Sequence, residues 1–160
     1  MKIKITADST CDLSPELVEK YNVGIMPLHV SLGEEDYLDG VTIQPQAIYE
    51  YYAANKVLPK SGCRTEEEYY NFFKGFLDEG YDAVIHYDIS AEMSGSYQNA
   101  AAAGKRLDGV YVVDSRNLST GTVLLVLDAC DMVAAGMAAD EIVKRSQKRA
   151  AAVQASFIID

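Results

Sequence analysis

A stretch rich in serine and glycine, residues 90–100, carries the most suggestive chemistry in the sequence. It follows an apolar run at residues 83–87 that is typical of a buried strand, and it leads into four alanines that are typical of a helix. Ser94, Gly95 and Ser96 lie between the two. A strand that turns through such residues into a helix presents unpaired backbone N–H groups and the positive end of the helix dipole. The stretch therefore predicts a binding site for a small anionic group.

Three further serines follow predicted strands, each with an aspartate one or two residues before it: Ser9, Ser90 and Ser115. In an open α/β sheet, ligands bind beyond the carboxyl ends of the strands. We therefore expect these serines to be possible members of a polar rim around the anion site. Aspartate and serine at strand ends also serve as ordinary turn and cap residues, so this alternative remains open. No cluster of residues in the sequence stands out as a metal site, and we expect none.

The elements that must position these residues alternate between strand and helix. Strands are predicted at residues 1–7, 25–32, 81–87, 110–113 and 153–160, with Pro27 making the second one irregular or an edge strand. Helices are predicted after Ser14, after a cap at Thr42, after a capping box at Thr65, and at about residues 96–107, 120–136 and 140–149. Residues 57–64 are predicted to be a loop. The pattern indicates one α/β domain over residues 1–160, with a mostly parallel sheet flanked by helices on both faces.

Composition excludes several classes of function. The chain has 160 residues and a net charge of −10, with no cluster of Lys and Arg that would suit nucleic acid or anionic lipid headgroups. Its longest apolar stretch, residues 123–127, is far shorter than a membrane-spanning helix, and the N-terminus does not resemble a signal peptide. Three widely spaced cysteines form no CxxC pair. We expect a cytoplasmic protein with reduced thiols, no nucleic-acid partner and no membrane insertion.

Six landmarks, in order and at matching spacing, resemble the DegV family of fatty-acid-binding proteins along the whole chain. They are residues 6–13 (TADSTCDL), 26–28 (MPL), 37–40 (YLDG), 59–61 (PKS), 94–100 (SGSYQNA) and 113–115 (VDS). The resemblance implies the fold of the family's N-terminal domain. Proteins of this family are usually nearly twice this long, and the chain stops in an apolar run. We therefore expect residues 1–160 to be the N-terminal part of a two-domain protein.

The resemblance also implies a ligand and a partner. The ligand is a long-chain fatty acid whose carboxylate meets Ser94 and Gly95, with Ser96 keeping the hydroxyl of the family's Thr, and Ser61 matching a Thr of the family's Thr-Ser-x-Pro loop. Some members present the acid to a separate fatty acid kinase protein, so the implied role is non-catalytic and needs no cofactor. The loop departs from the family at residues 62–64 (GCR), and Ala91 replaces a usual serine.

Two other functions remain open beside fatty-acid binding. A phosphate or phosphosugar would suit the same serine-rich helix start, but it would need polar walls, whereas a fatty acid needs an apolar cavity. Met26, Leu28 and Met93 are the possible lining of such a cavity, or ordinary core residues. A serine esterase would need a base for Ser94, yet the G-x-S-x-G motif is absent. The two histidines, His29 and His86, are the available bases, and we expect both to be structural.

Overall fold

Strand β1 (Ile3–Asp8) lies within a four-stranded sheet in the order β2-β1-β6-β7, all of whose pairings are parallel. The other strands are β2 (Gly24–Met26), β6 (Ala83–Asp88) and β7 (Val110–Asp114). The structure is a computed structural model, and it describes residues 1–156. Asp8, Asp88 and Asp114, the aspartates that precede the three rim serines, end β1, β6 and β7, so all three lie at one edge of the sheet.

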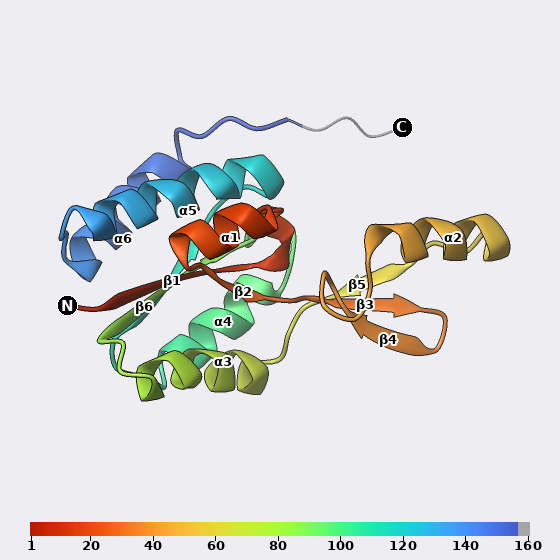
Figure 1. Cartoon of the computed structure of the whole chain (residues 1–160), viewed down its shortest axis with the longest axis horizontal. Coiled ribbons are helices and arrows are strands. Elements are labelled where there is room, and N and C mark those ends of the chain that lie inside the picture. The colour runs from red at the N-terminus through yellow and green to blue at the C-terminus, as the bar shows by residue number, and fades with distance from the viewer. Residues whose placement is uncertain (157–160) are drawn as a thin grey trace.

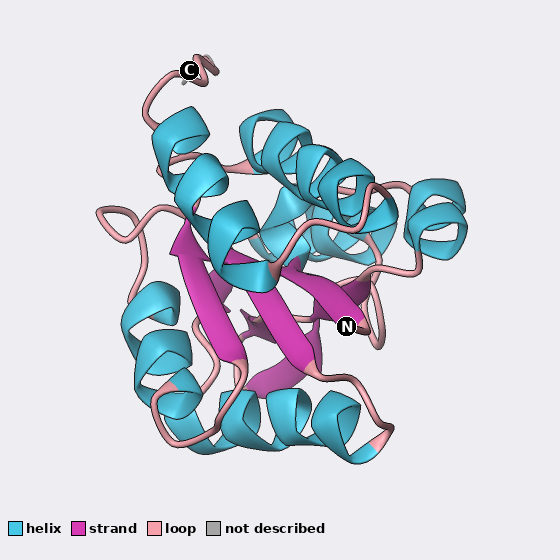
Figure 2. Cartoon of the chain, turned by 90° about the vertical axis from the view of Figure 1, so that its left-hand side faces the viewer, coloured by secondary structure: helices cyan, strands magenta, loops and turns pink. Residues whose placement is uncertain are grey.

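Helices cover both faces of this sheet (Figure 1 and Figure 2). One face carries α1 (Pro15–Tyr21), α5 (Ser119–Ala134) and α6 (Ala139–Ala150), and the opposite face carries α3 (Glu66–Asp78) and α4 (Ser96–Gly104). A short 3₁₀ helix, η1 (Ser9–Cys11), follows β1. The predicted fold class, a mostly parallel α/β sheet with helices on both faces, is confirmed.

Alternation along β1 and β6 gives the two faces different chemistry. Ile3, Ile5 and Ala7 join the apolar core that packs against α5 and α6. Thr6 and Asp8, which alternate with them, are fully buried on the other face. There the core also contains Met26 and the aromatic residues of α3. The face under α3 and α4 therefore combines an apolar part with a buried polar part.

A second sheet projects from this body as an arm, defined here as residues 29–62 (Figure 1). It contains β3 (His29–Leu32), β4 (Glu35–Leu38), α2 (Pro45–Asn55) and β5 (Lys60–Gly62), with antiparallel strand order β4-β3-β5. Pro27 separates β2 from β3 because it has no N–H group to donate to a ladder. The strand predicted at residues 25–32 is thus two strands, which belong to different sheets.

Three local predictions were wrong. Residues 57–64 contain β5, whose three residues lack a strand pattern and are held by pairing with β3. Thr42 does not cap a helix: its Oγ1 accepts a hydrogen bond from the Leu38 amide at 2.7 Å, and α2 begins at Pro45. Residues 153–156, the first half of the predicted last strand, have no regular structure, and residues 157–160 lie outside the described part. The caps at Ser14 and Thr65 are confirmed.

Replacing Gly24 with alanine is expected to destabilise the protein by about 1–3 kcal/mol, because the added methyl group overpacks the contact between β2 and α3. A Cβ atom at Gly24 would lie 2.8 Å from Cζ of Phe76 and 2.9 Å from Cγ2 of Thr6. Urea unfolding measures the change. Gly75→Ala is the control: nothing lies within 4 Å of its Cβ position in the interior of α3, and it should raise stability by about 0.5–1 kcal/mol. Equal stability of Gly24→Ala and the wild type would contradict this packing.

Candidate functional site

The turn between β6 and α4 places Ser94 just before the N-terminal end of α4. The Ser94 amide donates to the Ser90 carbonyl at 3.2 Å, which folds the chain back before α4 begins at Ser96. Ser94 Oγ accepts a hydrogen bond from the Ser96 amide at 3.2 Å and lies 3.0 Å from Ser96 Oγ. Ser94 is half-buried, Gly95 is exposed and Ser96 is fully buried. An anion at this point would meet one hydroxyl and the unpaired amides of the first helical turn.

The end of the arm lies against this turn. A Cβ atom on Gly95 would lie 3.7 Å from Sγ of Cys63. Asn99 Nδ2, one turn into α4, donates to the Arg64 carbonyl at 2.8 Å and contacts Cys63 Sγ at 3.6 Å. The structure therefore brings the segment that follows β5 to the Ser94 turn. Ser61 itself is exposed and pairs with Val30 in the arm sheet, two residues before Cys63.

A charged cluster anchors the same segment to α3. Arg64 Nη2 lies 3.0 Å from Glu68 Oε1, and His29 Nε2 lies 3.3 Å from the same oxygen. Arg64 Nη1 is 3.3 Å from His29 Nε2. The Arg64 charge is thus paired with a carboxylate, which reduces what it offers to an incoming anion. The donors at the helix start remain the principal groups for holding one.

The three rim serines hold loops in place. Ser9 Oγ accepts from the Leu28 amide at 3.1 Å, which fastens the base of the arm to the body. Ser90 Oγ accepts from the Glu92 amide at 3.3 Å. Ser115 Oγ donates to the Asn117 carbonyl at 2.9 Å and lies 3.1 Å from Thr122 Oγ1. Their position at the carboxyl edge of the sheet agrees with the sequence prediction, while their hydroxyls bond within the fold.

The three possible lining residues do not share one cavity. Met26 and Leu28 are buried, and Met26 belongs to the core beneath α3. Met93 is 52% exposed. It borders a pocket of about 320 Å³ together with residues 116–120 and the segment at Ala155. A larger pocket, about 360 Å³, lies between α5 and α6 and contains none of the predicted site residues.

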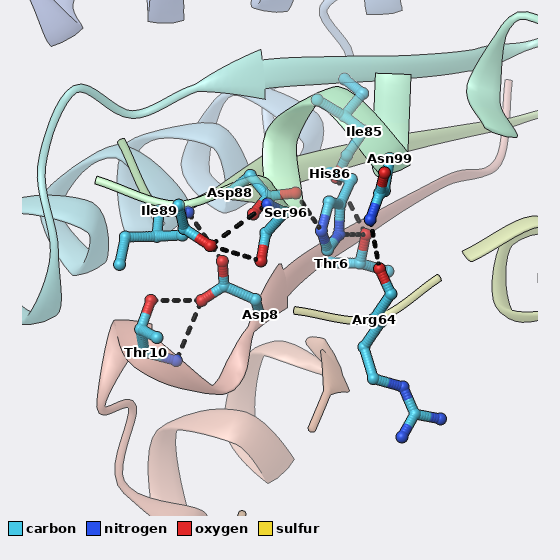
Figure 3. Close-up of polar contacts among 11 residues, drawn as sticks. Thr6, Asp8, Thr10, Arg64, Ile85, His86, Asp88, Ile89, Ser96 and Asn99 are labelled. Carbon is cyan, nitrogen blue, oxygen red and sulfur yellow. Dashed lines mark hydrogen bonds and ion pairs between the residues drawn. The ribbon is translucent and has the colours of Figure 1, made fainter. Parts of the chain in front are cut away.

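A buried polar cluster behind the turn was not predicted as a unit. It consists of Thr6, Asp8, Tyr69, His86 and Asp88, all fully buried. Figure 3 shows how Thr6, Asp8, His86 and Asp88 lie. The signal was present, because residues 6 and 8 and residues 86 and 88 alternate onto one face of adjacent strands whose register pairs Thr6 with His86. Charged residues usually lie at the surface, so the sequence alone did not suggest that these side chains are buried together.

His86 is held within this cluster by one hydrogen bond. Its Nδ1 lies 2.9 Å from Thr6 Oγ1, while Nε2 lies 3.4 Å from Asp88 Oδ2 without hydrogen-bond geometry. The rings of Tyr69 and Phe73 pack edge-on against the imidazole. Burial lowers the His86 pKa to about 4, so the side chain is neutral at pH 7. Neither His86 nor His29 bonds to Ser94, which leaves the esterase reading without a base in the described structure.

Asp8 and Asp88 end the paired strands β1 and β6, and the register of the pairing places them side by side. Asp8 accepts hydrogen bonds from the Thr10 and Ile89 amides at 2.9 and 2.7 Å, while both Asp88 oxygens lack a donor (Figure 3). Burial raises the pKa of Asp8 to about 7 and that of Asp88 to about 6, and the neighbouring Asp88 carboxyl raises the Asp8 value further. The pair therefore retains a proton near neutral pH.

Among the described residues, no group of three or more His, Cys, Asp or Glu side chains is arranged to hold a metal ion. None of the described helices combines the length and hydropathy that a membrane span requires.

Comparisons with known proteins bear on this geometry. The model of the DegV family, described as an uncharacterised protein family, matches residues 2–160. A curated DegV domain-containing protein of Clostridium perfringens is 41% identical over 145 residues, which are 89% of this chain and 52% of that protein. One from Clostridium acetobutylicum is 34% identical over 143 residues, covering 88% and 51%. The chain spans about half the length of these curated relatives.

Solved structures give the same result. A DegV family protein of Thermus thermophilus, described by its fatty acid binding, has a TM-score of 0.86 at 28% identity, covering 94% of this chain and 54% of that one. A stearic acid-binding protein from Eubacterium ventriosum has a TM-score of 0.81 at 32% identity, covering 90% and 52%. DegV of Bacillus subtilis, described as a fatty acid binding protein, has a TM-score of 0.86 at 26% identity, covering 94% and 54%. The resemblance inferred from the six landmarks is confirmed.

The buried acid pair predicts a stability that falls as pH rises. Because the folded-state pKa values exceed the usual 3.8, the folded protein holds protons that the unfolded chain has lost, and this stabilisation disappears as pH rises through 6 to 7. His86 acts oppositely, because its folded pKa is below 6.5 and its contribution is lost only as pH falls from 6.5 towards 4. The carboxyl groups of Asp8 and Asp88 therefore determine how the stability changes between pH 6.5 and 8.

Asp88→Asn should flatten this dependence and raise the free energy of unfolding at pH 8 by about 1–3 kcal/mol, because it removes a buried group without a donor. Urea unfolding at pH 6.5, 7 and 8 measures it. The control is Asp114→Asn, since Asp114 is half-buried and accepts from the Ala91 and Arg116 amides. It should keep the wild-type slope. An unaltered slope in Asp88→Asn would show that the pair holds no shared proton.

Proposed function

Because this chain belongs to the DegV family, we propose that it binds a long-chain fatty acid and holds the carboxylate at the start of α4. The observation that carries the proposal is the half-buried Ser94 hydroxyl at the start of α4, whose N-cap residue Gly95 has no side chain to cap the first helical turn. The Thermus, Eubacterium and Bacillus proteins, which are described as binding fatty acids, share this fold. Hydroxyl and amide donors suit a carboxylate because bonds to an ionised acceptor are the stronger kind.

The carboxylate site of the proposal comprises Ser61, Ser94, Gly95 and Ser96. Ser94 and the amide of Gly95 would provide donors from one side, while the Ser96 amide donates to Ser94 Oγ. The segment that follows Ser61 approaches from the other side through Cys63. Ser96 is too buried to touch the ligand and instead contacts Ser94. Ser9, Ser90 and Ser115 support the surrounding loops rather than the ligand.

The tail would leave the helix start across Met93, the exposed member of the proposed lining. Met26 and Leu28 are buried and share no pocket with Met93 in the described structure, so they would contribute to the tail site only from within the core. The relatives are about twice as long as this chain, which supports the proposal that residues 1–160 are the N-terminal α/β domain of a two-domain protein. A second domain would supply the rest of the apolar wall.

We further propose that the protein is not itself catalytic and acts in the cytoplasm by presenting the acid to a separate fatty acid kinase. Support comes from the exposure of Gly95, which leaves the carboxylate approachable, and from the lack of contact between either histidine and Ser94. A phosphosugar remains the second candidate, because the helix-start donors suit phosphate equally well. The two ligands differ in the apolar surface that they require.

Native mass spectrometry of the protein purified from cells should detect a bound fatty acid. Ser94→Ala should weaken its binding by about 1–3 kcal/mol, because a hydrogen bond to a charged group is lost. Titration with stearic acid measures the difference. Ser90→Ala, which removes a hydroxyl bonded to the Glu92 amide, is the control and should keep the wild-type affinity. Absence of any acyl ligand together with binding of a phosphosugar would favour the second candidate.

Bound stearic acid should protect Cys63 from alkylation, because this thiol lies against the Ser94 turn. Cys63 is exposed, whereas Cys11 and Cys130 are buried, so reaction with iodoacetamide in the folded state reports on one thiol. Mass spectrometry of the labelled peptide gives the rate with and without ligand, and we expect it to fall at least about fivefold at saturation. Unfolded protein in urea should label at all three cysteines and provides the control. Equal rates with and without bound acid would place the ligand elsewhere.

A further inference from the structure

Asn99 joins α4 to residues 63–64, the segment that follows β5. Its Nδ2 donates to the Arg64 carbonyl at 2.8 Å and contacts Cys63 Sγ at 3.6 Å. In Figure 3 the Asn99 side chain points to the main chain of Arg64, whereas the Arg64 guanidinium points away from Asn99. The bond therefore holds the backbone of this segment and does not involve the charge of Arg64.

This contact lies beside the proposed carboxylate site. The Asn99 main-chain amide donates to the Gly95 carbonyl at 3.2 Å, so Asn99 follows Gly95 by one turn on the same side of α4. The Cβ position of Gly95 is 3.7 Å from Cys63 Sγ. Residues 63–64 therefore lie along the side of α4 that carries Gly95 and Asn99, and they form a second wall next to the Ser94 turn.

Two helices hold this second wall in different ways. The guanidinium of Arg64 is paired with Glu68 of α3, with 3.0 Å between Nη2 and Oε1. A long side chain with several rotatable bonds leaves the backbone that carries it free to shift. The Asn99 side chain instead bonds to the Arg64 carbonyl itself. The distance between this segment and Gly95 therefore depends chiefly on Asn99.

The second wall carries donors that the fold does not use. Within the described part of the chain, the amides of Cys63 and Arg64 donate no hydrogen bond. Successive main-chain amides without a partner suit an anionic group. A carboxylate has two oxygens that only accept, so one can meet the Ser94 hydroxyl while the other meets an amide of residues 63–64. The position of the second wall then affects how firmly a carboxylate is held.

We propose that Asn99 is a positioning residue for the ligand carboxylate, because its bond to the Arg64 carbonyl fixes residues 63–64 as the second wall of the site. This inference rests on the proposed function and adds a determinant of headgroup specificity to it. A fatty alcohol of equal length has a single oxygen in its headgroup and gains less from a second set of donors. Release of the wall therefore weakens an acid more than an alcohol.

Asn99→Ala tests the proposal. It removes the amide, and alanine is the strongest helix former, so α4 itself is not weakened. We expect the affinity for stearic acid to fall about fivefold, as for one lost hydrogen bond, and the affinity for stearyl alcohol to change less than about twofold. Calorimetric titration of both ligands gives the two ratios. A purely structural role would weaken both ligands alike, and that result would overturn the proposal.

Two further variants separate the hydrogen bond from packing. Asn99→Leu keeps a side chain of similar size without a donor, so it should match Asn99→Ala; wild-type affinity in Asn99→Leu would overturn the proposal. Asn55→Ala is the matched control, because Asn55 Nδ2 donates to the Tyr51 carbonyl at 3.0 Å within α2. It should keep the wild-type preference for acid over alcohol. An equal change of that preference in Asn55→Ala would also overturn the role of Asn99.

Limited digestion with trypsin tests the same bond without any ligand. Release of residues 63–64 should raise cleavage after Arg64 at least about fivefold in Asn99→Ala, relative to cleavage after Arg116, an exposed loop residue of the body. Mass spectrometry of the fragments gives the ratio. An unchanged ratio in a protein that binds stearic acid would reject the role of Asn99 alone. A raised ratio in a protein whose wild type binds no stearic acid would reject the proposed function and leave Asn99 as a structural tie.

Discussion

The parallel pairing of β1 with β6 is the constraint on which the rest of the structure depends. Its register aligns Thr6 with His86 and brings the ends of both strands, Asp8 and Asp88, to the same edge of the sheet. One face of the pair is mainly apolar, with the Tyr87 hydroxyl bonded to Ser146, and the other buries hydroxyl, imidazole and carboxyl groups. The turn that carries Ser94 emerges directly above this polar face. Carboxyl groups that are costly to bury therefore lie next to the turn that carries Ser94.

Sequence reasoning recovered the parts of the fold that local chemistry determines. Ser14 and Thr65 were recognisable as caps because their side chains satisfy amides within three residues, and Pro27 marked a break because it lacks an N–H group. The helix start at Ser94 followed from the same kind of local reasoning. In each case the interaction that matters spans only a few residues.

Other features depend on partners that are distant in the chain. β5 is a strand only because β3 lies beside it, since residues 60–62 carry no strand pattern. The contact of Cys63 with the Ser94 turn joins segments about thirty residues apart, and spacing alone does not disclose it. The buried acids were hidden for a different reason, because a single carboxyl in a strand usually marks an exposed position. Only the register between β1 and β6 reveals that the two buried carboxyl groups lie beside each other.

The division of one expected strand at Pro27 has a consequence for how this protein can diversify. The body contains the core, whereas the residues that flank the arm on either side join it to the body through polar contacts, among them Ser9 with Leu28 and Asn99 with Arg64. Neither of the two core clusters of the described residues contains a residue of the arm, so substitutions within the arm sheet are expected to leave the packing beneath α3 and α4 unchanged. The fold thus separates the packing that stabilises the body from an arm in which substitutions can accumulate, and selection can act on the second without weakening the first.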